Sequence, residues 1–268
     1  MAKLVQQMAD LYEVVQKHVD PRSKDWFITS SILVPITIIA VYLLIVKRWG
    51  PRFMANRAPY KIEPLVAAYN LSNILICTYL VFRSVQLWFK MDYSFLCQPF
   101  DKEETEDNRE YANLVWGYAA LKVWDLLDTI FFVLRKKDRH VSFLHVYHHS
   151  TMVFGGYLGC KFILNGGLTL IGVINSFVHI VMYSYYLYTT LFPNSRPSLG
   201  VKKSITLLQL TQFTILIIHN ILPFLQPNCE VERFWCLVLL VQASFMFAMF
   251  ADFYIKNYTT AKEAKKMN

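Results

Sequence analysis

Long apolar runs, each ended by charged residues, proline or glycine, alternate with shorter polar segments along the chain. Seven of these runs come close to or exceed the roughly 20 residues that a helix needs to cross the hydrocarbon core of a membrane. None alternates strictly between apolar and polar positions, as the shorter strands of a membrane β-barrel do. We therefore predict an all-α integral membrane protein with seven transmembrane helices. They are expected at residues 27–46, 65–89, 115–134, 141–159, 168–191, 205–225 and 234–255.

The composition supports a membrane protein. Of the 268 residues, 55% are hydrophobic and only 17% are charged, and the mean hydropathy is +0.31. Soluble domains of this size seldom reach such a value. The segment before the first span is polar and lacks the basic start and short apolar core of a cleaved signal peptide. We therefore expect the first span to act as its own signal anchor.

Charge is divided unequally between alternate loops. The basic loops lie at 47–61, 135–140 and 196–203, and the acidic loops lie at 90–111 and 228–233. Because basic loops of membrane proteins tend to remain in the cytosol, we expect the N-terminus in the lumen and the C-terminus in the cytosol. The predicted regions are a lumenal arm at 1–26, a seven-helix domain at 27–255 and a cytosolic tail at 256–268.

The cysteines and the tail indicate a compartment. Cys97 and Cys229 both lie in loops assigned to the lumen, where an oxidising environment allows them to join, and we predict a disulfide between them. The chain ends in KKMN, with Lys265 and Lys266 at the positions of a cytosolic dilysine retrieval signal. A simple juxtamembrane charge cluster is the alternative interpretation of these lysines. We expect a multi-pass protein of the endoplasmic reticulum membrane.

Polar and ionisable residues gather within the predicted spans. An ionisable group there costs about 2.5–3.5 kcal/mol on insertion scales, so each one is a functional candidate. Lys122 can pair with Asp125, but Asp128 has no such local partner. At a rise of about 1.5 Å per residue, the candidates converge in the cytosolic half of the membrane. They are Lys122, Asp125, Asp128, His145, His148, His149, Asn175, His179, Thr206, Gln209 and Gln212. The isolated His219 is interpreted as packing.

The sequence His145-Val-Tyr-His148-His149 is compatible with more than one chemistry. Its spacing is similar to the histidine boxes of membrane di-iron desaturases and hydroxylases, but those sites take several boxes and this chain has seven histidines in all. A zinc ion held by His145, His149 and His179 is another alternative. A neutral imidazole can instead attack a thioester and carry the acyl group. A non-catalytic seven-span transporter or receptor also stays open.

Four motifs taken together resemble those of the very-long-chain fatty acid elongase family, and the resemblance spans nearly the whole chain. The first is Lys122-Val-Trp-Asp125-Leu-Leu-Asp128-Thr129, in which Asp125 replaces the family's usual Glu. The second is the histidine box, which is intact. The other two are Asn175 to His179 with Met182, Tyr183, Tyr185 and Tyr186, and Thr206 with Gln209, Gln212 and Phe213.

The resemblance implies a condensing enzyme of the endoplasmic reticulum, a 3-ketoacyl-CoA synthase. Such an enzyme joins a long-chain acyl-CoA to malonyl-CoA and releases a 3-ketoacyl-CoA, carbon dioxide and CoA. The resemblance also implies six helices in a barrel around the acyl chain, with one helix outside. No cofactor or metal is expected beyond the two CoA substrates. The implied partners are membrane lipid and the ketoacyl reductase, dehydratase and enoyl reductase of the elongation cycle, with a homodimer as one allowed assembly and no nucleic acid.

Each candidate residue has an expected role in that reaction. We expect His148 to attack the acyl thioester, while Asp128 and either His145 or His149 orient and deprotonate it. Asn175 and His179 then stabilise the enolate that malonyl-CoA forms when it loses carbon dioxide. The basic residues of the cytosolic loops are expected to bind the phosphates of CoA. The tendency of basic loops to remain in the cytosol also explains these residues without a ligand. The expected substrate-binding residues are Lys122, Arg135, Lys137, His140, Tyr185, Lys202, Thr206, Gln209 and Lys262.

Overall fold

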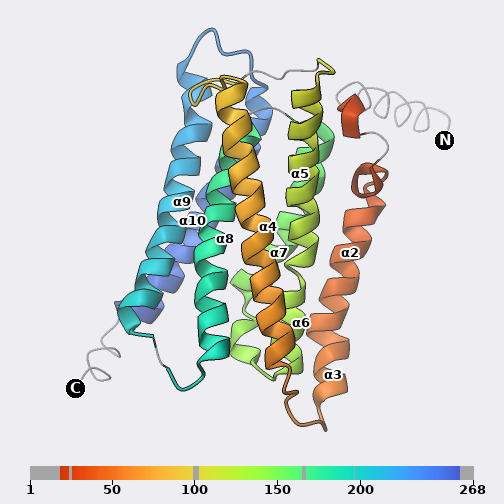
Figure 1. The fold of residues 1–268 in the computed structure, drawn as a ribbon, viewed down its shortest axis with the longest axis vertical. Helices are drawn as coiled ribbons and strands as arrows, with labels where there is room; N and C mark the ends of the chain where they lie inside the picture. The colour runs from red at the N-terminus through yellow and green to blue at the C-terminus, as the bar shows by residue number, and fades with distance from the viewer. Residues whose placement is uncertain (1–18, 24–25, 99–102, 165–166, 196, 260–268) are drawn as a thin grey trace, which may run out of the picture.

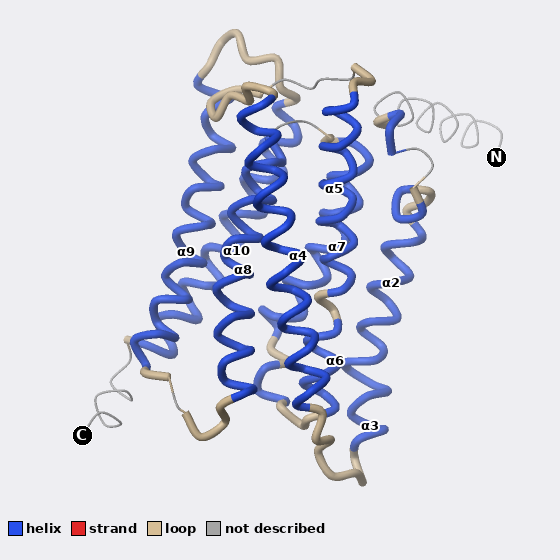
Figure 2. The backbone as a smooth tube through the Cα atoms, viewed as in Figure 1, coloured by secondary structure: helices blue, strands red, loops and turns tan. Residues whose placement is uncertain are grey.

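A computed structural model gives the fold and describes residues 19–23, 26–98, 103–164, 167–195 and 197–259. All regular secondary structure in these residues is helical, which confirms the all-α prediction. The long helices stand side by side and run the length of the molecule (Figures 1 and 2). Most of the predicted arm and the end of the predicted tail lie outside the described residues, together with Lys262, Lys265 and Lys266.

The main helices correspond to the predicted spans, with some different boundaries. They are α2 (Leu33–Leu44), α3 (Gly50–Met54), α4 (Glu63–Lys90), α5 (Glu106–Trp124), α6 (Leu127–Leu134), α7 (Phe143–Phe162), α8 (Gly167–Leu191), α9 (Leu199–Ile221) and α10 (Arg233–Tyr258). The π-helix η3 (Ile45–Trp49) joins α2 to α3 in one continuous segment. Short 3₁₀ turns complete the structure: η1 (Pro21–Ser23), η2 (Phe27–Thr29), η4 (Asp138–His140) and η5 (Leu222–Leu225).

Hydroxyl side chains cap the first turns of three helices. Thr105, Ser142 and Ser198 each accept a hydrogen bond from the backbone N–H three residues later, at the starts of α5, α7 and α9. Such caps satisfy donors that the start of a helix leaves open. The predicted boundaries at 115 and 205 were set by hydropathy, which does not detect such caps. α5 and α9 therefore begin before these boundaries.

A tight turn separates α5 from α6 in the middle of the predicted span 115–134. The N–H of Leu126 bonds to the carbonyl of Val123, and the N–H of Asp128 bonds to the carbonyl of Asp125. Each bond reaches back three residues instead of four, which is the 3₁₀ pattern, and such stretches inside helices often mark functional positions. The turn falls within the motif that begins at Lys122 and therefore sets where its side chains point.

Five helical segments of the described residues are long and apolar enough to cross a membrane. They are Leu33–Met54, Glu63–Lys90, Gly167–Leu191, Leu199–Leu225 and Arg233–Tyr258. The predicted spans 115–134 and 141–159 are absent from this set. The first is split by the turn and carries Lys122, Asp125 and Asp128, and the second contains the histidine box. The polar residues of these two segments lower their hydropathy. Five of the seven predicted spans are therefore supported.

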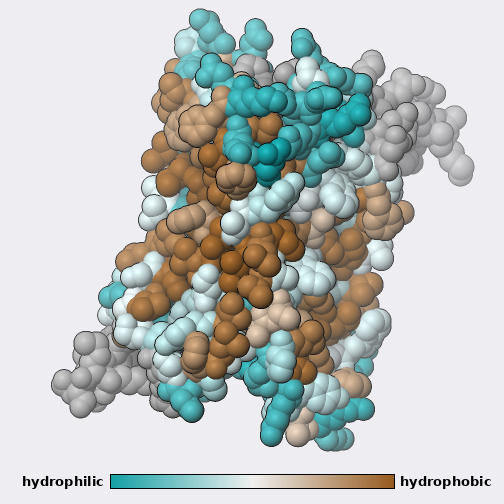
Figure 3. All heavy atoms as spheres, viewed as in Figure 1, coloured by the Kyte–Doolittle hydropathy of each residue, from teal (hydrophilic) through white to brown (hydrophobic). Residues whose placement is uncertain are grey.

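Apolar residues predominate across the middle of the face seen in Figure 3, between two more polar ends. On α4, the side chains of Leu75, Tyr79 and Phe82 follow one another along the outer face, with exposed fractions of 61%, 58% and 59%. Large apolar side chains gathered in such a band are typical of a surface that contacts lipid instead of water. The bundle is therefore built as a multi-pass membrane protein.

Three antiparallel pairs of helices provide most of the packing. α4 packs along α8, α9 along α10, and α5 along α7. Smaller contacts join α4 to α5, α8 to α9, and α7 to α10, while α2 lies against α7. α5 and α7 approach closely at Gly156, where an added Cβ would lie 3.0 Å from the Cβ of Ala119. This close pair holds the motif that begins at Lys122 beside the histidine box.

The two ends of the bundle differ in chemistry. The disulfide end holds a bond between Cys97 and Cys229, which confirms that prediction and joins the α4–α5 connection to the segment before α10. The basic end holds Arg135, Lys136 and Lys137 in the connection between α6 and α7. These connections lie at opposite ends of the molecule, top and bottom in Figure 1.

Candidate active site

Lys122 and Asp125 form a buried ion pair. Each residue is 1% exposed, and Lys122 Nζ donates to Asp125 Oδ2 at 3.1 Å. The ammonium group also lies 4.7 Å from the centre of the Tyr118 ring, whose face attracts cations. The predicted pairing of Lys122 with Asp125 is confirmed. Each charge needs the other here, because an unpaired ion in a buried position is strongly destabilising.

Asp128 finds its partner on another helix. The hydroxyl of Tyr183, on α8, donates to Asp128 Oδ2 at 2.7 Å and also lies 3.2 Å from Asp125 Oδ1. The hydroxyl of Tyr69, on α4, lies 3.3 Å from that of Tyr183. One phenol thus connects both carboxylates of the motif. Its hydroxyl, rather than an imidazole, is the partner that the structure gives Asp128, and an orienting role toward His148 stays a prediction.

The three histidines of the box have different surroundings. His145 Nε2 lies 2.9 Å from the hydroxyl of Thr129, at the end of the Lys122 motif. The ring of His149 lies between its neighbours, with its centre 4.3 Å from that of His145 and 5.5 Å from that of His148. His148 faces a cavity between the helices. The box therefore forms a line of three imidazoles that leads from Thr129 to the cavity.

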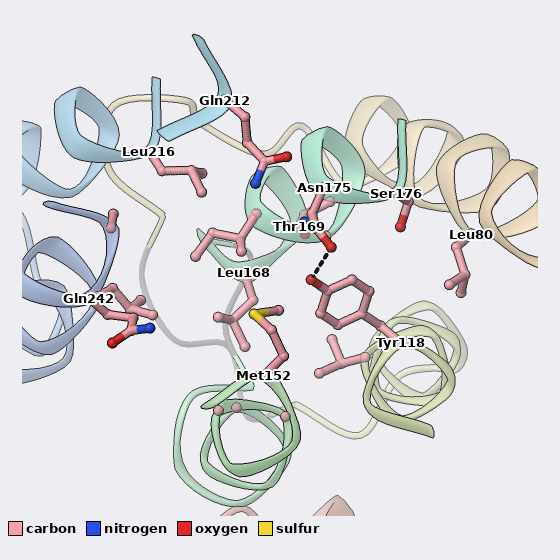
Figure 4. A pocket seen from close by; sticks show the side chains of 18 of the residues that line it. Leu80, Tyr118, Met152, Leu168, Thr169, Asn175, Ser176, Gln212, Leu216 and Gln242 are labelled. Atoms are coloured by element: carbon pink, nitrogen blue, oxygen red, sulfur yellow. Dashed lines mark hydrogen bonds between the residues drawn. The ribbon is translucent and has the colours of Figure 1, made fainter. Parts of the chain in front are cut away.

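His179 and Asn175 lie four residues apart on α8. His179 is 5% exposed, and its Nδ1 lies 3.7 Å from Asp125 Oδ2. Asn175 is 4% exposed, and its Oδ1 accepts a hydrogen bond from the hydroxyl of Tyr118 at 2.7 Å, drawn as a dashed line in Figure 4. Because the carbonyl of this amide is already bonded, its NH₂ group is the end that is left to meet a ligand.

The main cavity extends from His148 toward the disulfide end. α4, α5, α7, α8, α9 and α10 all contribute to its wall, which is largely apolar. Along α7 the wall runs from His148 through Met152 and Gly155 to Gly159, a rise of about 16 Å. Figure 4 looks into this cavity, with Met152 and Leu168 among the side chains that point into it. A largely apolar cavity that His148 lines at one end is suited to a long hydrocarbon chain with a reactive head.

Three of the predicted CoA-binding residues lie at the basic end. Arg135 Nη2 donates to Glu63 Oε1 at 3.2 Å. The ring of His140 packs on Phe132, with ring centres 5.0 Å apart. Partial loss of water around His140, together with the positive charge of Lys137, lowers the pKa of His140 from its usual 6.5. The lowered pKa favours the neutral form of His140 at pH 7, so the positive charge of this loop comes from its arginines and lysines.

Four further predicted binding residues lie on the α8–α9 side. Gln209 Nε2 lies 3.0 Å from the sulfur of Met182, and the buried Thr206 donates its hydroxyl to the carbonyl of Lys202 at 3.2 Å. The side chain of Lys202 is exposed. Tyr185 lines a separate groove between α8 and α9. Within the described residues these four lie outside the lining of the main cavity, so they suit a part of a substrate that stays outside it.

The imidazoles are not arranged as a metal-binding set. The described part of the chain holds no group of three or more His, Cys, Asp or Glu side chains that could bind a metal ion. The contacts of His179 are instead with Asp125 Oδ2, at 3.7 Å, and with the ring of Tyr183. The geometry offers these rings as nucleophiles, bases and hydrogen-bond donors.

Tyrosines are the residues of this site that the sequence analysis missed. Tyr42 bonds to Thr129 at 2.9 Å, while Tyr69 and Tyr118 bond to Tyr183 and Asn175. Tyr118 could have been found, because it lies four residues before Lys122 and therefore on the same helix face. Tyr42 and Tyr69 gave no comparable signal, since they come from other helices and meet the motifs only in three dimensions.

Comparison with known proteins gives one consistent result. The sequence pattern of the ELO (GNS1/SUR4) family matches residues 27–266. The chain is 32% identical to very long chain fatty acid elongase 1 of Mus musculus over 256 residues, or 95% of this chain and 92% of that protein. It is 35% identical to elongase 4 of Mus musculus over 248 residues (92% and 78%), and 33% identical to elongase 7 of Rattus norvegicus over 251 residues (93% and 89%). The chain therefore belongs to the ELO (GNS1/SUR4) family and is a relative of the very long chain fatty acid elongases.

Proposed function

We propose that this enzyme of fatty acid elongation catalyses the condensation step, as a very-long-chain 3-oxoacyl-CoA synthase. It joins a long-chain acyl-CoA to malonyl-CoA and releases a 3-ketoacyl-CoA, carbon dioxide and CoA. Membership of the elongase family supports the role in elongation. The observation that carries the condensation chemistry is the position of His148, which opens on an apolar cavity whose wall it shares with Asn175.

In the first half-reaction, a ring nitrogen of His148 attacks the thioester carbonyl of acyl-CoA. A neutral imidazole is a competent nucleophile at cytosolic pH. His149, whose ring adjoins that of His148, takes the proton of the attacking ring and passes it to the departing CoA thiolate. His145, held by Thr129, keeps His149 in place. The acyl group waits on His148 with its chain in the main cavity.

In the second half-reaction, malonyl-CoA enters and its carboxylate leaves as carbon dioxide. The electron pair of the broken carbon–carbon bond forms an enolate, whose oxygen accepts hydrogen bonds from Asn175 and His179. Tyr118 favours this role, because its bond to the Asn175 carbonyl leaves the NH₂ group free to donate. The enolate carbon then attacks the acyl carbonyl, the carbon–nitrogen bond to His148 breaks, and the released ring takes up a proton from water. Asp125 and Asp128 both bond to the hydroxyl of Tyr183. These bonds hold α8, which carries His179, against the junction of α5 and α6.

We assign the recognition of CoA to the basic end. Arginine and lysine side chains bind phosphate by charge-assisted hydrogen bonds, and a neutral His140 can add one uncharged donor. Tyr185, Thr206 and Gln209 would contact the pantetheine arm as it enters. Lys122, buried beside the site, contributes positive charge near the reacting end. The residues assigned to the CoA phosphates are Arg135, Lys137, His140, Lys202 and Lys262.

The proposal includes the arrangement in the membrane. α7, and α5 continued by α6, cross it in addition to the five apolar segments, which makes seven spans. The contacts between helices support a six-helix barrel around the acyl chain, because they run from α5 to α4, α8, α9, α10 and α7 and return to α5. α2 then lies outside the barrel.

We assign the protein to the endoplasmic reticulum membrane, with the disulfide end in the lumen and the basic end in the cytosol. The bond between Cys97 and Cys229 supports a lumenal environment, and the basic loop at the other end supports a cytosolic one. The arm at 1–26 would be lumenal and the tail at 256–268 cytosolic. The condensation needs no cofactor beyond its CoA substrates, and the reductases and dehydratase of the cycle would take up its product in the same membrane.

Carbon dioxide release tests the proposal directly. The purified protein in liposomes receives a long-chain acyl-CoA and malonyl-CoA labelled at the free carboxyl. We expect labelled carbon dioxide and a 3-ketoacyl-CoA in equal amounts, and the loss of both in His148→Ala. His219→Gln is the matched control, because the ring of His219 packs on Phe95 at the disulfide end, with centres 5.3 Å apart. Absence of carbon dioxide release with every acyl-CoA tried would reject the condensation function.

The covalent intermediate needs a separate measurement. The protein is incubated with acyl-CoA alone, digested and analysed by mass spectrometry. We expect an acyl group on the peptide that contains His148. If the protein condenses its substrates fully but no histidine is acylated, the enolate attacks acyl-CoA directly and the covalent route is wrong.

A further inference from the structure

Gln212 is a buried amide that has no hydrogen-bond partner in the wall of the main cavity. The residue is 5% exposed and lies on α9. Its Oε1 atom is buried and unbonded, and no described residue bonds to its NH₂ group. Figure 4 shows the amide directed into the cavity, between Leu216 and Asn175. Its NH₂ group, which no described residue occupies, is available to donate a hydrogen bond to a ligand in the cavity.

Gln212 lies at the level of the reacting groups. Gln209 on α9 contacts Met182 on α8 at 3.0 Å, and the two helices run antiparallel. Moving three residues along α9 from Gln209 to Gln212 therefore matches moving three residues back along α8 from Met182 to His179. His148 and Asn175 line the same cavity as Gln212. The open amide is therefore aimed at the head of an acyl chain and not at its tail.

The proposed reaction leaves one developing charge without a donor. Asn175 and His179 serve the enolate oxygen in the second half-reaction, but attack of His148 in the first half-reaction also places negative charge on an oxygen, that of the acyl carbonyl. An acyl chain offers no other hydrogen-bond acceptor once it lies in an apolar cavity. An uncharged NH₂ group suits this oxygen, because it donates without adding a permanent charge to the cavity.

We propose that Gln212 is a catalytic residue that binds the thioester carbonyl oxygen of acyl-CoA and stabilises the oxyanion formed when His148 attacks. This inference rests on the proposed condensation function. A lone pair of the His148 ring forms the new carbon–nitrogen bond, and the carbonyl π electrons move to the oxygen that Gln212 holds. These electrons then reform the carbonyl as the carbon–sulfur bond breaks. The thiolate takes the ring proton through His149 and leaves as CoA.

The test separates the two half-reactions. Gln212→Met keeps the size of the side chain and removes the donor. With acyl-CoA alone, we expect the rate of CoA release and of acyl-enzyme formation to fall about 10²- to 10³-fold, the usual loss for one oxyanion donor. The KM for acyl-CoA should change little, since the bond strengthens mainly in the transition state. The thermal midpoint should stay the same or rise, because the variant removes an unbonded buried group.

Ser176→Ala is the matched control. Ser176 lines the same cavity, is 1% exposed, and its hydroxyl also has no partner among the described residues. We expect this variant to slow acyl transfer less than tenfold, because we assign no reacting oxygen to Ser176. An equal loss in both variants would show that any change of the wall slows the reaction, and it would overturn the specific role of Gln212.

The outcomes distinguish this inference from the function on which it rests. If the wild-type protein releases no carbon dioxide from malonyl-CoA with any acyl-CoA, the condensation function fails. If the wild type condenses and Gln212→Met retains a normal rate of CoA release from acyl-CoA, only the role of Gln212 fails. A lower thermal midpoint in Gln212→Met, together with a clearly raised KM for acyl-CoA, would indicate a structural residue and would also overturn it.

Discussion

Two adjoining regions place polar groups inside this apolar bundle, and they treat those groups in opposite ways. In the motif cluster, defined by Lys122, Asp125, Asp128 and Tyr183, each side chain has a partner within 3.2 Å. In the cavity wall, Gln212 and Ser176 are also buried, but their side-chain oxygens have no partner among the described residues. A bonded set fixes the positions of helices, whereas an unbonded set is ready for a substrate. Stability should therefore depend on the first region and catalysis on the second.

The largest effect is expected where the motif cluster loses its cation. Lys122→Met leaves Asp125 ionised, buried and unpaired, and breaking such a pair costs about 3–5 kcal/mol of folding free energy. Denaturation in detergent should show a correspondingly lower midpoint. The double variant Lys122→Met with Asp125→Leu removes both charges and should recover much of the loss. An unchanged midpoint in the single variant would mean that the carboxylate finds another partner or water.

A smaller loss is expected when the phenol between the two carboxylates is removed. Tyr183→Phe leaves Asp128 without the hydroxyl that donates at 2.7 Å, and hydrogen bonds to charged groups contribute about 1.5–3 kcal/mol. The free energy of unfolding should fall by that amount. Tyr188→Phe is the matched control on the same helix, because Tyr188 is exposed and bonds to Ser195. Equal effects in the two variants would contradict a special role for the motif cluster.

The cavity wall should respond in specificity and not in stability. An added Cβ at Gly172 meets nothing within 4 Å, and the residue lines the cavity two helical turns from His179, about 10 Å away. Gly172→Phe should therefore fold normally but obstruct long acyl chains. We expect kcat/KM to fall at least about tenfold (about 1.4 kcal/mol) for chains that reach this depth. Gly172→Ala should change it little, and a uniform loss for all chain lengths would contradict the prediction.

The smallest effect is expected at the basic end. Glu63 holds Arg135 in a largely exposed pair, and such pairs contribute little to stability. Glu63→Gln should barely change the denaturation midpoint but should strengthen binding of CoA about two- to threefold at low salt, because Arg135 is released. Calorimetric titration with CoA measures this, with Glu232→Gln at the other end of the bundle as the control. Binding that weakens in Glu63→Gln would show that Glu63 positions Arg135 for CoA.

Some features of this comparison could be predicted from sequence, and others could not. The pairing of Lys122 with Asp125 followed from spacing along one helix, and the disulfide followed from two cysteines in loops on the same side. The turn at Asp125 and Leu126 could not be predicted, because it depends on backbone hydrogen bonds and not on hydropathy. The partner of Asp128 could not be predicted either. Tyr183 is far from Asp128 in the sequence and meets it only because α8 packs beside α6.

The open amide of Gln212 could not be predicted for a different reason. A motif can show that a residue belongs to a site, but whether its side chain lacks a hydrogen-bond partner depends on all the residues packed around it. Gln212 could therefore be named from its motif, but its role could not be predicted. The spans 115–134 and 141–159 differ from both cases: they were predicted, but their polar residues lower the hydropathy by which a span is recognised.

The contact between Gly156 and Ala119 has a consequence for the chemistry as well as for the packing. It lies eight residues along α7 from His148, about 12 Å away, where the two backbones are as close as their side chains permit. A methyl group there would require α5 and α7 to move apart by a few tenths of an ångström, and the histidines of α7 would move with their helix. Misplacement of a reacting group by about 1 Å can cost a hundredfold in rate. The absence of a side chain at Gly156, which also lines the cavity, thus sets how closely α7 approaches α5 and where the imidazole of His148 lies.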